Sequence, residues 1–142
     1  MDTIYFNSKS ELYNEFSNFY EAEFSLDGKV WKTVEHYFQH EKFPGDTELQ
    51  AKIWAARTPS IAKRLGQTRS VYFLADWNQK RNEVMERALR AKFSQHPELY
   101  KKLKSTGESW LVEKSTTDDY WGSGRTGCGL NMMGKLLMKI RK

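Results

Sequence analysis

The sequence contains one cysteine, three prolines and no long hydrophobic run. Because Cys128 has no second cysteine to pair with, an internal disulfide is excluded, which favours a reducing compartment. No stretch approaches the roughly 18 apolar residues of a membrane span. The start, MDTIYFNSKSELYNEF, has neither the basic segment nor the apolar run of a signal peptide. We therefore expect a cytoplasmic protein that does not associate with membranes.

The sequence also lacks internal repeats, low-complexity runs and a linker rich in Pro, Gly or Ser. A chain of 142 residues is the size of one ordinary domain, so we expect a single domain over 1–142. Hydrophobic residues make up 39% of the chain and charged residues 29%, a composition typical of a folded core. The net charge of +5 favours attraction to phosphate groups, whether of a nucleic acid or of a small molecule.

Short strands are predicted near both ends of the chain. Residues 3–8 and 110–115 read as extended segments, and 21–26 and 29–33 flank Asp27-Gly28, a dipeptide typical of a two-residue hairpin turn. The hairpin predicts a small antiparallel sheet near the N-terminus. Since the rest of the pattern is largely helical, we expect an α+β, mainly helical fold.

Helix signals occupy most of the remaining chain. Thr33 can cap a helix that runs to about Phe43, before Pro44-Gly45. Further helices are predicted over 46–57, over 58–66 with Pro59 at the first position, over 77–97 and over 97–107, and a last one from Asn131. The segments 9–21 and 116–131 read as loops. The helix after Asp76 should be the central core element, with these residues inward: Trp77, Arg81, Val84, Met85, Ala88, Leu89 and Phe93.

The stretch TVEHYFQHEKF, residues 33–43, carries the densest chemistry. Glu35, Gln39 and Lys42 are four and seven positions apart, so a helix would place an acid, an amide and an amine on one face. Such a stripe is either a solvated surface or one wall of a site. Its aromatic neighbours, Tyr37, Phe38 and Phe43, favour a wall.

His36 and His40 are also four apart, a spacing that can hold zinc. However, HYFQH lacks the glutamate that follows the first histidine of zinc proteases, and His96 and Cys128 have no supporting spacing. We expect neither a metal nor a cofactor.

GSGRTG, residues 122–127, matches the dinucleotide-binding pattern GxGxxG. Too few residues follow Gly127 for the required βαβ unit, so a Rossmann fold is excluded. The backbone of Gly122 and Gly124 could still cradle a phosphate with help from Arg125; the alternative is a flexible surface loop.

Asp118 and Asp119 precede Tyr120 and Trp121. Carboxylates beside an aromatic plane suit the grip of ribose hydroxyls and the stacking of a base, but they also suit a buried anchor with capping acids. Basic residues recur in the last two helices, and their side chains are either solvated helix faces or a nucleic-acid track: Lys101, Lys102, Lys104, Lys135, Lys139, Arg141 and Lys142.

The informative segments of the chain are FSNFY (16–20), GKVWKTVEHYFQHEKF (28–43), AKRLG (62–66), the Trp, Arg, Val-Met and Ala-Leu positions of 77–97, and LVE with DDYWGSG and MGKLLMKIR within 111–141. Taken together and in this order, they resemble the NADAR family of N-glycosidases. The resemblance spans nearly the whole chain, and the combination of EHYFQ..KF with D.YWG.G is specific. One departure is His40, where the family often has a small residue.

The resemblance implies hydrolysis of the bond between ribose C1 and a nitrogen. Two substrate classes are implied: ADP-ribose attached to guanine, in nucleic acid or a nucleoside, and phosphorylated ribosylamino-pyrimidine intermediates of riboflavin synthesis. It also implies that Glu35, Lys42, Trp77, Asp118 and Trp121 belong to the site, with Asn18 close by. A non-catalytic module that binds ADP-ribose or a nucleotide is the alternative from another class.

Breaking this bond requires proton transfer at the leaving nitrogen and stabilisation of C1. Glu35 suits the acid and base steps, Asp118 can hold ribose hydroxyls, and a deprotonated Lys42 could form a Schiff base with the opened ribose, a route that the resemblance favours. We therefore predict Glu35, Lys42 and Asp118 as catalytic. The predicted substrate-binding residues are Asn18, Phe19, Tyr37, Gln39, Trp77, Arg81, Trp121, Gly122, Gly124 and Arg125.

Overall fold

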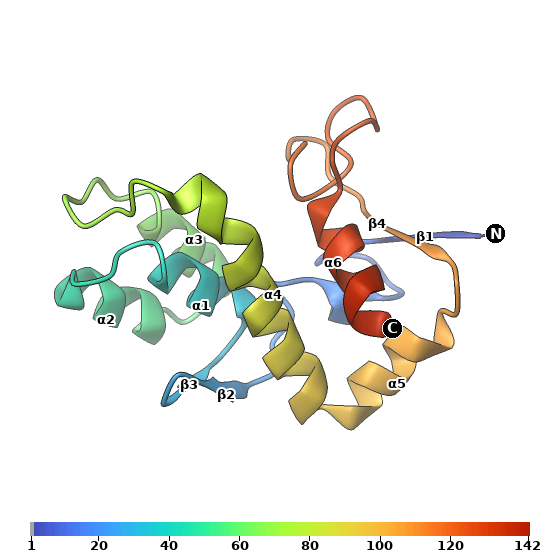
Figure 1. Cartoon of the computed structure of the whole chain (residues 1–142), viewed down its shortest axis with the longest axis horizontal. Helices are drawn as coiled ribbons and strands as arrows, with labels where there is room; N and C mark the ends of the chain where they lie inside the picture. The colour runs from blue at the N-terminus through green and yellow to red at the C-terminus, as the bar shows by residue number, and fades with distance from the viewer. Residues whose placement is uncertain (1) are drawn as a thin grey trace. The chain divides into compact units, whose positions relative to one another are not determined.

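The computed structural model describes residues 2–142, which fall into two compact units. Unit 1 combines the residues up to Tyr20 with His96–Lys142, and unit 2 is Glu21–Gln95. Figure 1 shows the course of the chain through the labelled elements.

Unit 1 is built on two parallel strands from opposite ends of the sequence. β1 (Thr3–Phe6) pairs with β4 (Trp110–Glu113), and Thr3 lies opposite Trp110. The unit also contains a short 3-10 helix (Asn14–Phe16), α5 (Pro97–Ser105) and α6 (Met132–Arg141). α6 packs on β4 and on α5 (Figure 1), and its buried residues include Met133, Leu136, Leu137 and Ile140.

Asn131 joins the start of α6 to β4. Its side chain donates a hydrogen bond to the carbonyl of Leu111 (2.9 Å) and accepts one from the amide of Glu113 (2.9 Å). Gly134 allows this approach, because a Cβ at that position would collide with the carbonyl of Leu111. The hydrogen bonds of Asn131 and the absence of a side chain at Gly134 therefore hold α6 close against β4.

Unit 2 begins with the predicted hairpin. β2 (Phe24–Leu26) and β3 (Lys29–Trp31) are antiparallel, and Asp27 and Gly28 between them have φ of 52° and 79°. Two consecutive positive φ angles are what the tight turn requires, and this explains the Asp-Gly pair.

Four helices complete unit 2: α1 (Val34–His40), α2 (Thr47–Ala55), α3 (Pro59–Leu65) and α4 (Trp77–Gln95). Side chains of Thr33, Asp46 and Thr58 accept hydrogen bonds from amides in the first turns of α1, α2 and α3. α1 packs against the other three helices, so it is the most enclosed element of this unit.

The structure confirms the α+β, mainly helical fold class and the N-terminal hairpin. The predicted end of the first helix is wrong: α1 ends at His40, not near Phe43. Beyond it the chain tightens, with the amides of Lys42 and Phe43 donating to carbonyls three residues back. Pro44 accounts for this, because proline disfavours helical backbone in the residue before it. The single domain over 1–142 stays a prediction.

Two features of the core were not predicted. The parallel pairing of β1 with β4 joins segments more than a hundred positions apart, and Lys92 is fully buried among the core residues of α4. Within residues 2–142, none of the helices has the length and apolar character needed to cross a membrane.

Candidate active site

A buried acid and amide form the centre of the candidate site in unit 2. Glu35 and Gln39, one turn apart on α1, are each 3% exposed, and Gln39 Nε2 donates to Glu35 Oε2 at 2.6 Å. The predicted wall of a site on this face is thus an enclosed pair of polar groups, not a solvated stripe. A buried carboxylate whose oxygen is held by an amide is positioned for proton transfer.

Gly66, the residue directly after α3, makes room for this pair. Gln39 Oε1 lies against Gly66, where a Cβ would collide with the amide. Gly66 has φ of −65°, so the glycine is required for space and not for an unusual backbone. Within the described residues Gln39 Oε1 is buried and has no hydrogen-bond partner.

Lys42 lies just after α1 and is half-buried. Its Nζ is 5.8 Å from the ring centre of Phe38, and it makes no ion pair or hydrogen bond with another side chain in residues 2–142. Burial lowers the pKa of Lys42 below its usual value; the charge of Glu35 opposes this shift, and that of Lys63 adds to it. The amine therefore loses its proton more readily than an exposed lysine does.

Aromatic rings lie beside these polar groups. The ring centres of Phe38 and Trp77 are 5.0 Å apart at 59°, and Trp77, the first residue of α4, is 6% exposed. Arg81 follows one turn later on α4 and is half-buried. Trp77 and Lys42 therefore both lie near the ring of Phe38.

Tyr37 occupies a different side of α1. It is fully buried, its hydroxyl donates to Asp27 Oδ2 at 2.7 Å, and its ring meets Trp31 edge-on at 5.1 Å. These contacts fasten α1 to the hairpin. A role for Tyr37 in substrate binding stays a prediction.

The two histidines of α1 are engaged in local contacts. His36 Nδ1 lies 2.7 Å from Thr33 Oγ1 and its Nε2 lies 2.9 Å from the carbonyl of Ala56, while His40 Nδ1 lies 2.7 Å from Glu41 Oε2. Burial lowers the pKa of His36, which favours its neutral form. Residues 2–142 contain no cluster of three or more His, Cys, Asp or Glu side chains suited to a metal ion.

In unit 1, Asp118 stabilises the loop before α6. Its Oδ1 accepts hydrogen bonds from the amides of Tyr120 (3.0 Å) and Trp121 (2.8 Å). The rings of Tyr120 and Trp121 meet edge-on at 5.0 Å. The aspartate thus orients the backbone that carries the tryptophan, which is the capping role weighed from the sequence.

The glycine-rich loop folds tightly on itself. The amides of Ser123, Gly129 and Asn131 donate to carbonyls of the same unit at 2.7 to 3.1 Å, and a Cβ on Gly122 would lie 2.8 Å from the carbonyl of Glu113. Gly124 is buried with φ of 71°, and Arg125 is exposed. These glycines serve close packing, and phosphate binding by Gly122, Gly124 and Arg125 stays a prediction.

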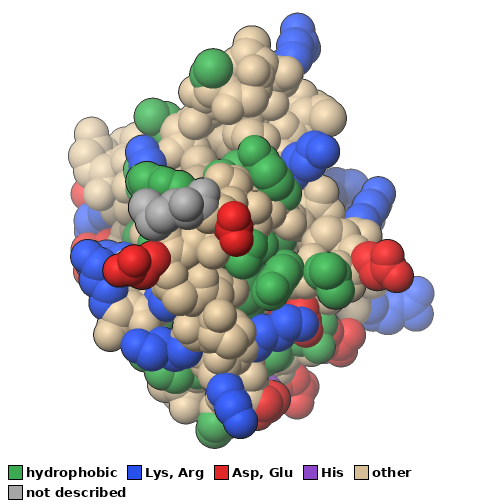
Figure 2. All heavy atoms as spheres, turned by 90° about the vertical axis from the view of Figure 1, so that its right-hand side faces the viewer, with side chains coloured by type: hydrophobic (Ala, Val, Ile, Leu, Met, Phe, Trp, Pro, Cys, Tyr) green, Lys and Arg blue, Asp and Glu red, His purple; other side chains and the backbone are tan. Residues whose placement is uncertain are grey.

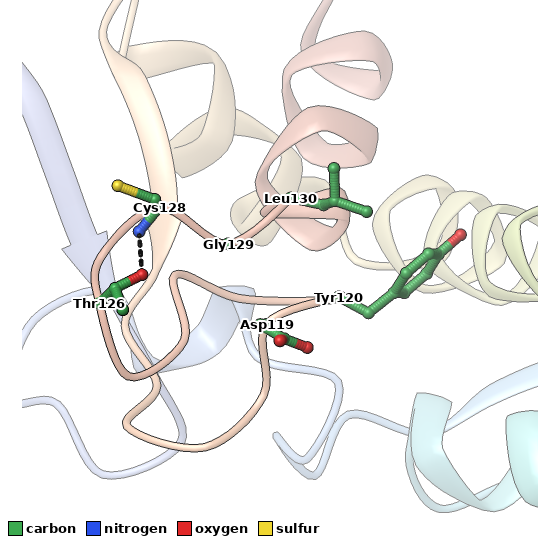
Figure 3. Close-up of a pocket in the computed structure, with 6 residues that line it drawn as sticks. All are labelled: Asp119, Tyr120, Thr126, Cys128, Gly129 and Leu130. Carbon is green, nitrogen blue, oxygen red and sulfur yellow. Dashed lines mark hydrogen bonds between the residues drawn. The ribbon is translucent and has the colours of Figure 1, made fainter.

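A surface pocket of about 340 Å³ lies between the two arms of this loop. Figure 3 shows Asp119 and Tyr120 on the outgoing arm, and Thr126, Cys128, Gly129 and Leu130 on the returning arm. The amide of Leu130 donates to the carbonyl of Asp119 at 2.8 Å, and this backbone hydrogen bond joins the two arms.

The predicted site residues divide between the units. Unit 2 brings together Glu35, Gln39, Lys42 and Trp77, with Arg81 on the same helix as Trp77. Unit 1 holds Asp118 and Trp121 in the loop, and also Asn18 and Phe19, which are half-buried after the 3-10 helix. Two relevant residues were missed, Lys63 and Gly66. Both stand in TPSIAKRLG, but nothing in that pattern shows that α3 packs on α1.

Comparison with known proteins identifies the class of this protein. N-glycosidase YbiA of Escherichia coli is 44% identical over 142 residues, which cover 99% of this chain and 88% of that protein. The NMR structure of E. coli YbiA matches with a TM-score of 0.89 and 42% identity, over 99% of this chain and 83% of that one. Riboflavin biosynthesis protein PYRR of Zea mays, a chloroplastic protein, is 40% identical over 97% of this chain and 24% of its own length.

The protein is accordingly an enzyme, a hydrolase that acts on N-glycosyl bonds. Residues 5–142 match the NADAR domain, and the chain belongs to that family. The protein is therefore a catalyst and not the non-catalytic binding module that was considered from the sequence.

Proposed function

We propose that this enzyme releases ADP-ribose from ADP-ribosylated guanine, in nucleic acid or in a nucleoside, by hydrolysing the bond from ribose C1 to nitrogen. One observation carries the chemical part of the proposal: Lys42 is a half-buried amine with a lowered pKa, and the charge of the buried Glu35 carboxylate acts on it. The substrate follows from the sequence resemblance, and the net charge of +5 suits its phosphates. The reaction would take place in the cytoplasm.

The proposed chemistry uses both groups on one ribose. The neutral amine of Lys42 attacks C1 as the bond to the leaving nitrogen breaks, and Glu35 donates a proton to that nitrogen. The C1–O4 bond then breaks, a proton passes from the attached amine to O4, and the opened ribose stays on Lys42 as a protonated Schiff base. Water adds to C1, and the Glu35 carboxylate accepts a proton from it. The bond from C1 to Lys42 then breaks as the added hydroxyl gives its proton to the amine, which leaves C1 as an aldehyde. Overall one water molecule is split between C1 and the nitrogen.

A substrate test with matched variants separates these roles. We expect the wild-type enzyme to release free ADP-ribose from ADP-ribosylated guanosine, and Glu35→Gln and Lys42→Ala to lose at least about 100-fold in kcat/KM. Lys52→Ala is the control, because Lys52 is an exposed residue of α2 paired with Glu48. Absence of free ADP-ribose with the wild type would contradict the proposed substrate.

A second candidate substrate class is favoured by the relatives named for riboflavin biosynthesis. These are phosphorylated ribosylamino-pyrimidines, in which the same type of bond joins ribose C1 to nitrogen. The kcat/KM of the wild-type enzyme with these compounds, compared with that for ADP-ribosylated guanosine, ranks the two classes. The same three variants test whether Glu35 and Lys42 keep their roles. A higher value for the pyrimidines would assign the enzyme to that class while leaving the roles of Glu35 and Lys42 intact.

A further inference from the structure

A basic groove lies in unit 1, outside the candidate active site of unit 2. It has a volume of about 770 Å³ and forms where α5 ends, β4 begins and the second half of α6 runs past. Its lining includes Lys104, Glu108, Trp110, Lys135, Lys139 and Arg141. This volume is within the range of pockets that hold a ligand.

The groove concentrates positive charge. Five basic side chains and one acidic side chain line it, in a chain whose net charge is +5. Lys135, Lys139 and Lys142 succeed one another at helical spacing on the side of α6 opposite its buried residues. Within residues 2–142, Lys104, Lys135 and Lys142 make no ion pair. Their charges are thus available to a ligand with several anionic groups.

An aromatic plane stands among these charges. Trp110, the first residue of β4, is 52% exposed although its strand is paired with β1. Arg141 is held by hydrogen bonds from Nη1 to Thr106 Oγ1 (3.0 Å) and to the carbonyl of Ser109 (2.8 Å), which leaves other N–H donors of its guanidinium for a ligand. Figure 2 shows basic side chains beside exposed hydrophobic ones on the face that carries the start of β1.

We propose that this groove binds single-stranded nucleic acid, with phosphates on its lysines and Arg141 and an unpaired base stacked on Trp110. Basic side chains interleaved with an aromatic ring are the usual means of gripping an unpaired strand. A duplex keeps its bases stacked and cannot offer one to the indole. An acidic peptide fits less well, because it does not present an aromatic base beside every charged group. A lipid surface also fits less well, because the apolar side of α6 is buried in unit 1.

Binding can be measured by fluorescence anisotropy with a labelled 12-nucleotide single strand, its duplex, and vesicles of anionic lipid. We expect the single strand to bind more tightly than the duplex or the vesicles. The Lys104→Ala, Lys135→Ala double variant should weaken this binding at least about 10-fold and reduce the slope of log K against log salt by about 1.4, or 0.7 for each phosphate contact.

Trp110→Leu should weaken binding between about 5-fold and 150-fold, since a stacked base contributes about 1–3 kcal/mol, and should leave the salt slope unchanged. The matched control is the Lys52→Ala, Lys80→Ala double variant, which removes two exposed positive charges from unit 2. Thermal unfolding of each variant reports whether the fold is retained.

The inference would be overturned if the Lys104→Ala, Lys135→Ala variant lowered the affinity for the single strand no more than the control does. Equal binding of the duplex, or preference for vesicles, would also overturn it. The inference goes beyond the proposed reaction: an enzyme that binds the oligonucleotide but releases no ADP-ribose would refute the proposed substrate and leave the groove assignment intact. Release from ADP-ribosylated guanosine should be unchanged in the groove variants.

Discussion

At the scale of the residue, the chemistry depends on the protonation of Lys42. Three influences set its pKa: burial and the positive charge of Lys63 lower it, and the negative charge of Glu35 raises it. The neutral amine is the nucleophile of the proposed reaction, so activity should rise with pH until Lys42 has lost its proton.

Lys63→Gln tests this balance. Removing a positive neighbour makes protonation of Lys42 more favourable, so its pKa rises, and the ascending limb of the kcat/KM profile should move to higher pH. Lys52→Gln removes an exposed charge of the same sign and should leave the limb in place. A limb that stays fixed in Lys63→Gln, or moves to lower pH, would show that Lys42 is not the group that titrates.

Asp118 offers a second test at this scale. Asp118→Asn keeps an oxygen that can accept from the amides of Tyr120 and Trp121, so we expect the free energy of unfolding to change by less than about 0.5 kcal/mol. If the carboxylate charge acts on the ribose, kcat/KM should fall at least about 10-fold. Full activity would restrict Asp118 to the capping of its loop.

At the scale of the element, the active carboxylate depends on how α3 approaches α1. Gln39 holds Glu35 and itself lies against Gly66, so the end of α3 fixes the carboxylate through the amide. The backbone at Gly66 is helical, so alanine could adopt it without strain. At a helical site with space for the methyl group, replacing glycine by alanine stabilises a protein by about 0.4–1 kcal/mol.

Gly66→Ala should therefore destabilise the protein by about 1–3 kcal/mol through overpacking, and should lower activity by displacing Gln39. In the Gln39→Ala background the same substitution should be neutral or stabilising, because the colliding amide is gone. Denaturant unfolding of the four proteins of this cycle gives the coupling. Equal effects of Gly66→Ala in both backgrounds would rule out the contact as the cause.

Local chemistry made most elements predictable. Thr33 and Thr58 begin their helices as expected, and Asp27-Gly28 turns the hairpin. The end of α1 was placed too late because the apolar pattern continues to Phe43, whereas Pro44 alters the backbone before it. The partner of β1 could not be predicted, since the sequence of a four-residue strand does not indicate which distant segment pairs with it.

In the candidate site, the sequence predicted the pair within one helix but not the contacts between helices. Helical spacing alone joined Glu35 to Gln39, as the structure shows. Spacing misplaced Lys42 on the helix, and it could not indicate Gly66 or Lys63, whose effects on Gln39 and Lys42 arise from packing between helices.

At the scale of the whole molecule, chain connectivity links the two units. Unit 1 is made from both ends of the sequence, and segment 21–95 is the connection between them. Pairing β1 with β4 must close this connection, and closing an unfolded segment costs more entropy than closing a folded one. We therefore expect one cooperative unfolding transition, in agreement with the predicted single domain.

Hydrogen exchange can test this cooperativity. Ile53 is fully buried in unit 2, so Ile53→Ala should cost about 2–5 kcal/mol. The amides of β4 in unit 1 should lose as much protection as those of α4 in unit 2. Exposed Lys52→Ala, the adjacent control, should change neither. Loss of protection confined to 21–95 would show that the units unfold independently.

Borohydride trapping during turnover of ADP-ribosylated guanosine tests the central assignment most directly. Reduction of the Schiff base should leave one ribose-derived adduct, which peptide mass mapping should place on Lys42, and Lys42→Ala should give none. An adduct on a different lysine, or sustained turnover in Lys42→Ala, would contradict the account.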